Sequence, residues 1–192
     1  MKENSAVRYS SLGQTLHWAM AVLILITFIY GPGGSEKHIY SAAREFDRQL
    51  HETLGLLIIV LTLLRVGWRA AATPPSEPPS IPHWMTITSK AVQLVMYILF
   101  FALPLTSITG AWLEGHPLTL LGNIQIAPLL AKSHETGKTI AEIHCWLGDA
   151  ILWLAGLHTV AALYHHFILK DSVRASMLPH KIFLSRHGAG KQ

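Results

Sequence analysis

The chain is poor in charged residues and almost devoid of cysteine. Of its 192 residues only 14% are charged, and Cys145 is the single cysteine. One cysteine excludes an internal disulfide, a four-cysteine zinc site and an iron–sulfur cluster held by cysteines, and without a CxxCH motif the chain cannot attach haem covalently. Because no internal repeat or second unit interrupts the sequence, we expect residues 1–192 to form a single membrane domain.

Apolar residues are abundant instead. They make up 51% of the chain, and a mean hydropathy of +0.35 is too apolar for an ordinary soluble domain. Apolar runs near the length of about 20 residues that crosses a bilayer predict an all-α fold, an integral membrane four-helix bundle. We place the helices at about 16–30, 51–68, 91–113 and 143–169, and expect Pro104 to kink the third. The first run has no small-residue cleavage site, so we expect it to be retained.

The distribution of basic residues predicts the orientation of these helices. Four spans place both termini on one side, and ten of the fifteen Lys and Arg residues lie at the termini and in the middle loop. By the positive-inside rule both termini are then cytoplasmic. The pI near 9.3 is therefore explained by topology, with membrane lipid as the expected partner and no nucleic acid.

Four of the twelve histidines lie at membrane depth, where ionisable groups are costly and usually functional: His17, His51, His144 and His158. His144 and His158 are 14 residues apart on one predicted helix, a rise of about 21 Å and within about 40° of whole turns. Because successive spans alternate in direction, His51 lies at the level of His144 and His17 at that of His158. The sequence thus predicts two layers of two histidines.

Two histidines from different helices at each level can ligate a planar haem on both faces, with haem iron left to one-electron transfer and no catalytic residue expected. Two other interpretations stay open. Each histidine could merely hydrogen-bond a neighbouring helix, or a zinc or iron ion could bind here. Such an ion would need three or more ligands at one depth, and Asp149 points about 140° away from His144.

Residues beside the histidines fit a flat ligand. Gly55, Gly148 and Gly156 would let a ring approach the helices closely, although ordinary helix packing explains each of them equally well. Arg65 and Arg69 end the second span, where they could pair with haem propionates or simply anchor the helix at the interface.

Five segments together resemble the bacterial cytochrome b561 family, related to the cytochrome b subunits of nickel–iron hydrogenases, over almost the whole chain. They are LHW at His17, LHETLG at His51, IHCWLG at His144, GLHTVAALYHH through His158, and KDSVRASMLP. The resemblance implies a bacterial inner-membrane bundle with two non-covalent b haems, ligated by the pairs His17/His158 and His51/His144, and oxidation of a donor coupled to quinone. Family members commonly have histidine where this chain has Lys90 and Gln93, which leaves the quinone and propionate surroundings open.

The expected function is a di-haem b-type cytochrome that transfers electrons across or within the inner membrane to a quinone, from an unknown donor. A quinone site is hypothesised at His165, His166 and Lys170, a polar cluster at the cytoplasmic interface, although paired histidines also anchor helices. Two alternatives remain. One is a superoxide:quinone oxidoreductase, which needs a cationic outer approach. The other is a membrane cytochrome b subunit of a dehydrogenase or hydrogenase, which needs a redox partner subunit. Homo-oligomers are also compatible with the sequence, and whether the chain is an enzyme is left open.

Overall fold

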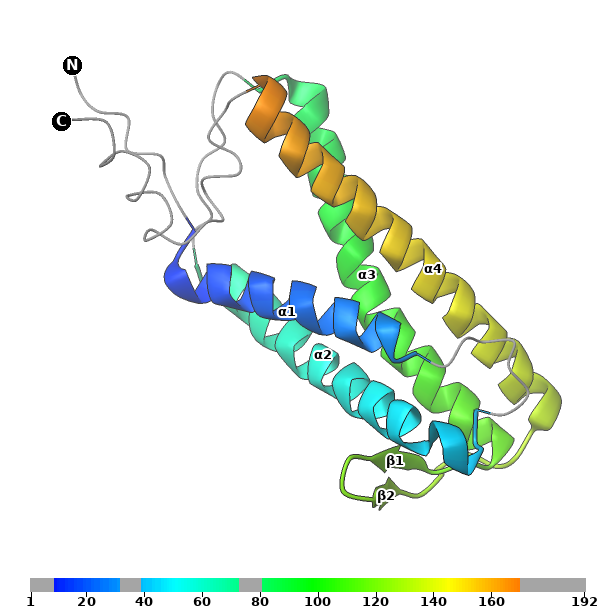
Figure 1. Cartoon of the computed structure of the whole chain (residues 1–192). Coiled ribbons are helices and arrows are strands. Elements are labelled where there is room, and N and C mark those ends of the chain that lie inside the picture. Colours follow the sequence, from blue (N-terminus) through cyan, green and yellow to red (C-terminus); the bar gives the residue numbers. More distant parts are fainter. Residues whose placement is uncertain (1–8, 32–38, 73–80, 170–192) are drawn as a thin grey trace, which may run out of the picture.

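The computed structural model describes residues 9–31, 39–72 and 81–169, and its main elements are four long antiparallel helices (Figure 1). Each helix is long and apolar enough to cross a membrane. The all-α fold class is therefore confirmed. The helices are α1 (Ser11–Ile29), α2 (Glu45–Ala71), α3 (His83–Glu114) and α4 (His134–Tyr164), with short helical turns η1 (Ala42–Arg44) before α2 and η2 (His165–Leu169) after α4.

The helices begin earlier than the apolar runs because hydrogen bonding continues past the hydrocarbon boundary. The hydroxyl of Ser10 caps α1 by accepting from the backbone N–H of Gly13 at 3.2 Å. The first turn of α2 carries Glu45 and Asp47, whose negative charges face the positive end of the helix dipole. These polar first turns are not hydrophobic, so hydropathy locates the membrane-spanning part of each helix but not the residue at which the helix begins.

A two-stranded antiparallel hairpin, β1 (Leu118–Leu120) and β2 (Ile124–Ile126), follows α3. We call the end of the bundle that carries it the hairpin end, and the opposite end the distal end. The turn between the strands places Gly122 at φ 82° and Asn123 at φ 60°, a backbone region that these two residue types tolerate best. The sequence analysis assigned only a loop to this segment.

The helices pack as α1 against α2, α2 against α3 and α3 against α4. In Figure 1 the α1–α2 pair and the α3–α4 pair lie closest near the hairpin and diverge toward the distal end. The buried core joins Met20 of α1, Leu99 and Phe100 of α3 and Ile151 of α4. Ile151 lies seven residues from both His144 and His158, so the apolar core separates the two histidine levels.

Candidate functional site

The four histidines at membrane depth meet in two pairs. His51 of α2 faces His144 of α4 with ring centroids 6.0 Å apart and ring planes at 84°, and we call this the hairpin pair. His17 of α1 faces His158 of α4 at 6.4 Å and 77°, the distal pair. These are the same pairs that spacing and helix direction predict. Each pair bridges two helices that are not packed directly against each other along their length.

The spacing of both pairs suits a single metal centre held between two imidazoles. A metal–nitrogen bond of about 2 Å on each side, plus about 1 Å from each nitrogen to its ring centre, separates the ring centres by about 6 Å. The observed separations are 6.0 and 6.4 Å. Within the described residues, no group of three or more His, Cys, Asp or Glu side chains could hold a metal ion.

The rings of the hairpin pair are fixed by backbone carbonyls. The Nδ1 of His51 lies 2.8 Å from the carbonyl oxygen of Thr27, and the Nδ1 of His144 lies 2.8 Å from that of Leu103. A carbonyl oxygen can only accept, so Nδ1 carries the proton in each ring and donates it. In a neutral imidazole the other nitrogen, Nε2, is then left with a lone pair for a metal. Each of these two histidines can therefore hydrogen-bond a neighbouring helix through Nδ1 and still bind a metal through Nε2.

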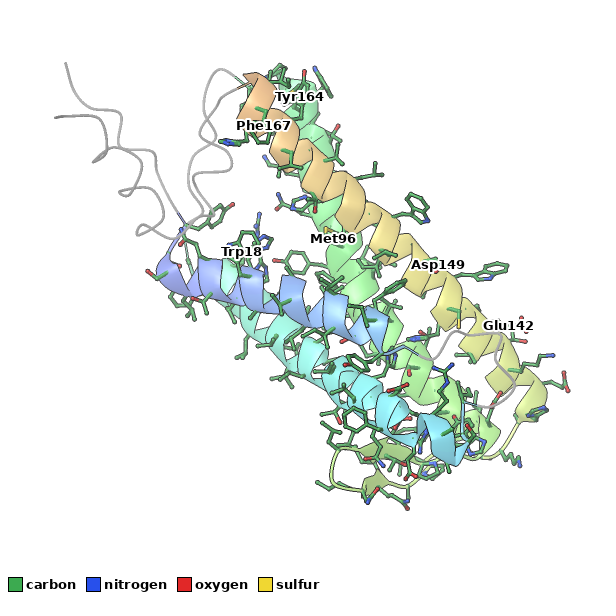
Figure 2. The ribbon with its side chains drawn as sticks, in the orientation of Figure 1. Trp18, Met96, Glu142, Asp149, Tyr164 and Phe167 are labelled. Atoms are coloured by element: carbon green, nitrogen blue, oxygen red, sulfur yellow. The ribbon has the colours of Figure 1, made fainter. Side chains whose placement is uncertain are left out.

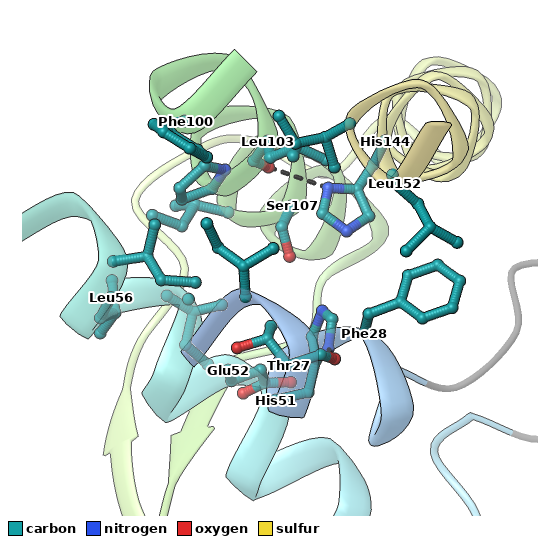
Figure 3. Close-up of a pocket in the computed structure, with 18 residues that line it drawn as sticks. Thr27, Phe28, His51, Glu52, Leu56, Phe100, Leu103, Ser107, His144 and Leu152 are labelled. Atoms are coloured by element: carbon teal, nitrogen blue, oxygen red, sulfur yellow. Dashed lines mark hydrogen bonds between the residues drawn. The ribbon is translucent and has the colours of Figure 1, made fainter. Parts of the chain in front are cut away.

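A cavity of about 110 Å³ surrounds the hairpin pair and is lined almost entirely by apolar groups. Figure 3 shows the imidazoles of His51 and His144 facing this space from α2 and α4. Gly55 and Gly148 line it too, and a Cβ added at either would meet no atom within 4 Å. The apolar lining of this cavity favours a ligand with apolar faces.

Arg65 lies at the distal pair. Its Nε donates to the Tyr97 hydroxyl at 3.1 Å, and its charge acts on both His17 and His158. Its Nη1 is buried and, among the described residues, has no hydrogen-bond partner. Arg69, one turn further along α2, is exposed. The structure thus brings the first of these two arginines to the histidines and leaves the second at the surface.

Arg48 is a further candidate near the hairpin pair, which the sequence offers only as part of an outer cationic patch with Arg44. It lies three residues before His51 on α2 and forms a salt bridge with Glu52 at 3.1 Å, with side chains only 14% and 9% exposed. Within the described part of the chain its buried Nε has no partner. The available signal was its spacing from His51, which places both on neighbouring turns of one helix face. Each histidine pair therefore has one nearby arginine with a buried nitrogen that has no hydrogen-bond partner among the described residues.

An aromatic stack lies beside Arg48 at the hairpin end, outside the helices that cross the membrane. The rings of Tyr40 and His116 are 3.6 Å apart and nearly parallel, and the Arg48 guanidinium lies 5.3 Å from the Tyr40 ring centre. Burial, with the nearby charges of Glu52 and Glu114, raises the pKa of Tyr40 to about 12. Burial also lowers the pKa of His116. At neutral pH Tyr40 is therefore protonated and His116 uncharged.

The remaining sequence candidates lie away from both pairs. His165 and His166 belong to η2, where their rings contact Tyr164 and Phe167, and Lys170 lies outside the described residues. Asp149 is exposed on the outer face of α4, and Figure 2 shows it pointing away from the other helices. Nothing in this geometry links Asp149 to the histidines.

Four spanning-capable helices with two facing histidine pairs, one of them at an apolar cavity, form the arrangement of a membrane b-type cytochrome. Comparison with known families agrees. The chain matches the prokaryotic cytochrome b561 family over residues 8–180, and it belongs to that family. It is accordingly a multi-pass membrane protein that binds b-type haem.

Three relatives show the breadth of this similarity. Cytochrome b561 homolog 2 of Escherichia coli strain K12 is 27% identical over 175 residues, covering 91% of this chain and 93% of that protein. The probable superoxide oxidase CybB of Yersinia pestis is 28% identical over 178 residues, with coverages of 91% and 97%. Cytochrome b562 of Cereibacter sphaeroides is 30% identical over 176 residues, with coverages of 88% and 94%.

Proposed function

We propose that the chain holds two b haems, one at each histidine pair, and transfers electrons between a donor at the hairpin end and a quinone at the distal end. The observation that carries the proposal is the pair of ring separations, 6.0 and 6.4 Å, each matching two axial ligands of one metal centre. A haem held by these histidines would supply one-electron redox chemistry.

The surrounding residues support haem over a bare ion. Imidazoles from two helices would bind the metal, and carbonyl oxygens on α1 and α3 orient the rings of the hairpin pair. Gly55 and Gly148 leave room along two helices, and the apolar cavity wall excludes water. Arg48 and Arg65 present buried N–H groups that suit the propionate carboxylates of haem b. The role proposed for Arg69 is the weaker one of interfacial anchoring.

We place the hairpin end outside the bacterial inner membrane and both termini in the cytoplasm. The support is the positive-inside bias, with ten of the fifteen basic residues at the termini and the middle loop. His144 and His158 are separated by about 21 Å of helical rise, most of the roughly 30 Å hydrocarbon thickness. Electrons passing between the pairs would therefore cross most of the membrane, and a quinone near His165 and His166 would take them at the cytoplasmic side.

A second candidate function is superoxide:quinone oxidoreduction. The feature that favours it is the pair Arg48 and Lys132, which both act electrostatically on His116 at the hairpin end, where Glu114 acts with the opposite sign. One relative carries the name probable superoxide oxidase. A membrane-subunit role is the remaining alternative, and a redox protein that co-purifies stably with the chain would support it.

The proposed function is tested first by haem stoichiometry. Purified protein should give a reduced-minus-oxidised spectrum of low-spin b haem, and a pyridine haemochrome assay should count two haems per chain. The variant His83→Leu, at an exposed histidine where α3 begins, is a matched control that should also retain two. A folded, monodisperse protein with one haem or none would contradict the proposal. Reduction of a soluble quinone by superoxide, absent without protein, would support the second candidate.

A further inference from the structure

We propose that Gly31 and Thr106 are positioning residues that fix the imidazole planes of His51 and His144. The inference rests on the proposed haem role of these histidines and concerns the contacts around the Nδ1 atom of each ring.

The end of α1 forms a socket for His51. The last carbonyls of an α-helix have no partner inside the helix. After α1 ends at Ile29, the backbone N–H of Gly31 turns back to donate to the Phe28 carbonyl at 3.1 Å. The Thr27 carbonyl instead accepts from the Nδ1 of His51 at 2.8 Å. The helix break therefore supplies the acceptor that holds the ring.

Gly31 forms the wall of the same socket. A Cβ built at this position would lie 3.2 Å from Cε1 and 3.3 Å from Nδ1 of His51, closer than ordinary van der Waals contact. An added Cβ, which would also lie 3.3 Å from the Phe28 carbonyl oxygen, would require a shift of a few tenths of an ångström. A shift taken up by the imidazole would change its hydrogen bond to the Thr27 carbonyl.

A turn of α3 forms the corresponding socket for His144. The Leu103 carbonyl accepts from the Nδ1 of His144 at 2.8 Å. The Thr106 hydroxyl, one turn along, is shared between the carbonyls of Ala102 at 2.8 Å and Leu103 at 2.9 Å. The Thr106 Oγ1 is itself 3.3 Å from the same Nδ1. The ring nitrogen thus meets two oxygens on one helix turn, which restricts rotation of the imidazole about its Cβ–Cγ bond.

The distal pair is held differently. Among the residues that the structure describes, neither His17 nor His158 forms a hydrogen bond through its ring, and Arg65 is the charge beside them. A hydrogen bond from Nδ1 to a carbonyl orients a ligating imidazole and makes it a stronger electron donor to the metal. Changes at Gly31 and Thr106 should therefore alter one haem and leave the other unchanged.

The test uses Gly31→Ala in the full-length, haem-loaded protein. Electron paramagnetic resonance of the ferric protein reports the angle between axial imidazole planes through the largest g value, and a redox titration gives both midpoint potentials. We expect one low-spin signal to shift and one midpoint to rise, because a weaker bond at Nδ1 makes the imidazole a poorer donor. The haem count and the second signal should match the wild type. Gly67→Ala is the matched control, since a Cβ on that α2 glycine meets no atom within 4 Å.

Thr106→Val makes the inference testable even if Gly31→Ala does not fold. It should shift the same signal by a smaller amount, and Thr106→Ser, which keeps the hydroxyl, should restore it. Thr88→Val is its control on α3, because the exposed Thr88 hydroxyl donates to the Trp84 carbonyl of its own helix. Wild-type signals and midpoints in Thr106→Val and in any folded Gly31→Ala protein would overturn the inference, as would equal shifts of both haems. A wild-type protein with fewer than two haems would instead overturn the proposed function.

Discussion

The two ends of the bundle hold equivalent histidine pairs by different means. At the hairpin end both rings donate to backbone carbonyls, and Leu118 of the hairpin lines their cavity while only 3% exposed. At the distal end the rings lie beside the charge of Arg65, where the α1–α2 and α3–α4 pairs diverge. Similar ring separations therefore occur with rings held by hydrogen bonds at one level and with rings beside a single arginine at the other.

The largest expected effect comes from filling the cavity of the hairpin pair. In Gly148→Leu the new side chain would occupy space that a Cβ enters freely in the wild type, so the haem proposed between His51 and His144 should be excluded. A haemochrome assay should then count one haem per chain instead of two. Retention of both haems in a folded Gly148→Leu protein would show that this cavity is not the haem site.

Removing the charge at the distal pair should have the next largest effect. A cation near a metal centre favours its reduced form, so Arg65→Gln should lower one midpoint potential. For unit charges about 8 Å or more apart at an effective dielectric near 20, the change corresponds to a free energy of about 1–2 kcal/mol. Arg69→Gln is the matched control, because Arg69 is exposed one turn away. Equal shifts in the two variants would remove the distinction between these arginines.

The contacts of Glu52, which join α2 to the hairpin, should contribute to the stability of the hairpin end only. The Glu52 carboxylate accepts from the backbone N–H of Thr119 and pairs with Arg48, so Glu52→Gln should destabilise the protein by about 1–3 kcal/mol. Thermal unfolding in detergent would measure the loss. Asp47→Asn is the control, since its pair with Arg44 is long, at 3.7 Å, and partly exposed. An equal fall in the unfolding temperatures of Glu52→Gln and Asp47→Asn would contradict this role of Glu52.

The smallest expected effect is on how the stability of the hairpin end depends on pH. Because the folded-state pKa of His116 is lowered, the unfolded chain takes up the proton first as pH falls. The contribution of His116 to stability is therefore complete above about pH 6.5 and is lost as pH falls from there toward the folded pKa. His116→Phe, which can still stack on Tyr40, should reduce the loss of stability between pH 7.5 and 5.5. An unchanged pH profile would contradict this role.

Residue spacing predicted which histidines lie together, because helical periodicity and alternating spans place side chains at known levels and faces. It could not predict the sockets, since the acceptors on Thr27 and Leu103 are backbone groups that every residue carries. The surroundings of Arg48 could not be predicted because they include groups outside α2, namely the Tyr40 ring and His116.

The hairpin was missed for a related reason. Its three-residue strands are too short for a periodic signal, and they are held by α2 side chains: Thr53 accepts from the Leu121 N–H at 2.9 Å, and Gln49 donates to Asn123 at 2.8 Å. Such tertiary contacts determine a structure that local propensity leaves undecided.

The most direct test of the account compares four single variants, each replacing one of the four histidines by leucine: His17, His51, His144 and His158. The account predicts that the spectra and midpoint potentials fall into two groups. His51→Leu should match His144→Leu, each having lost the haem at the hairpin end, and His17→Leu should match His158→Leu, each retaining that haem. Four folded variants that lose haem in any other grouping, or that all retain two normal haems, would contradict the two-pair account.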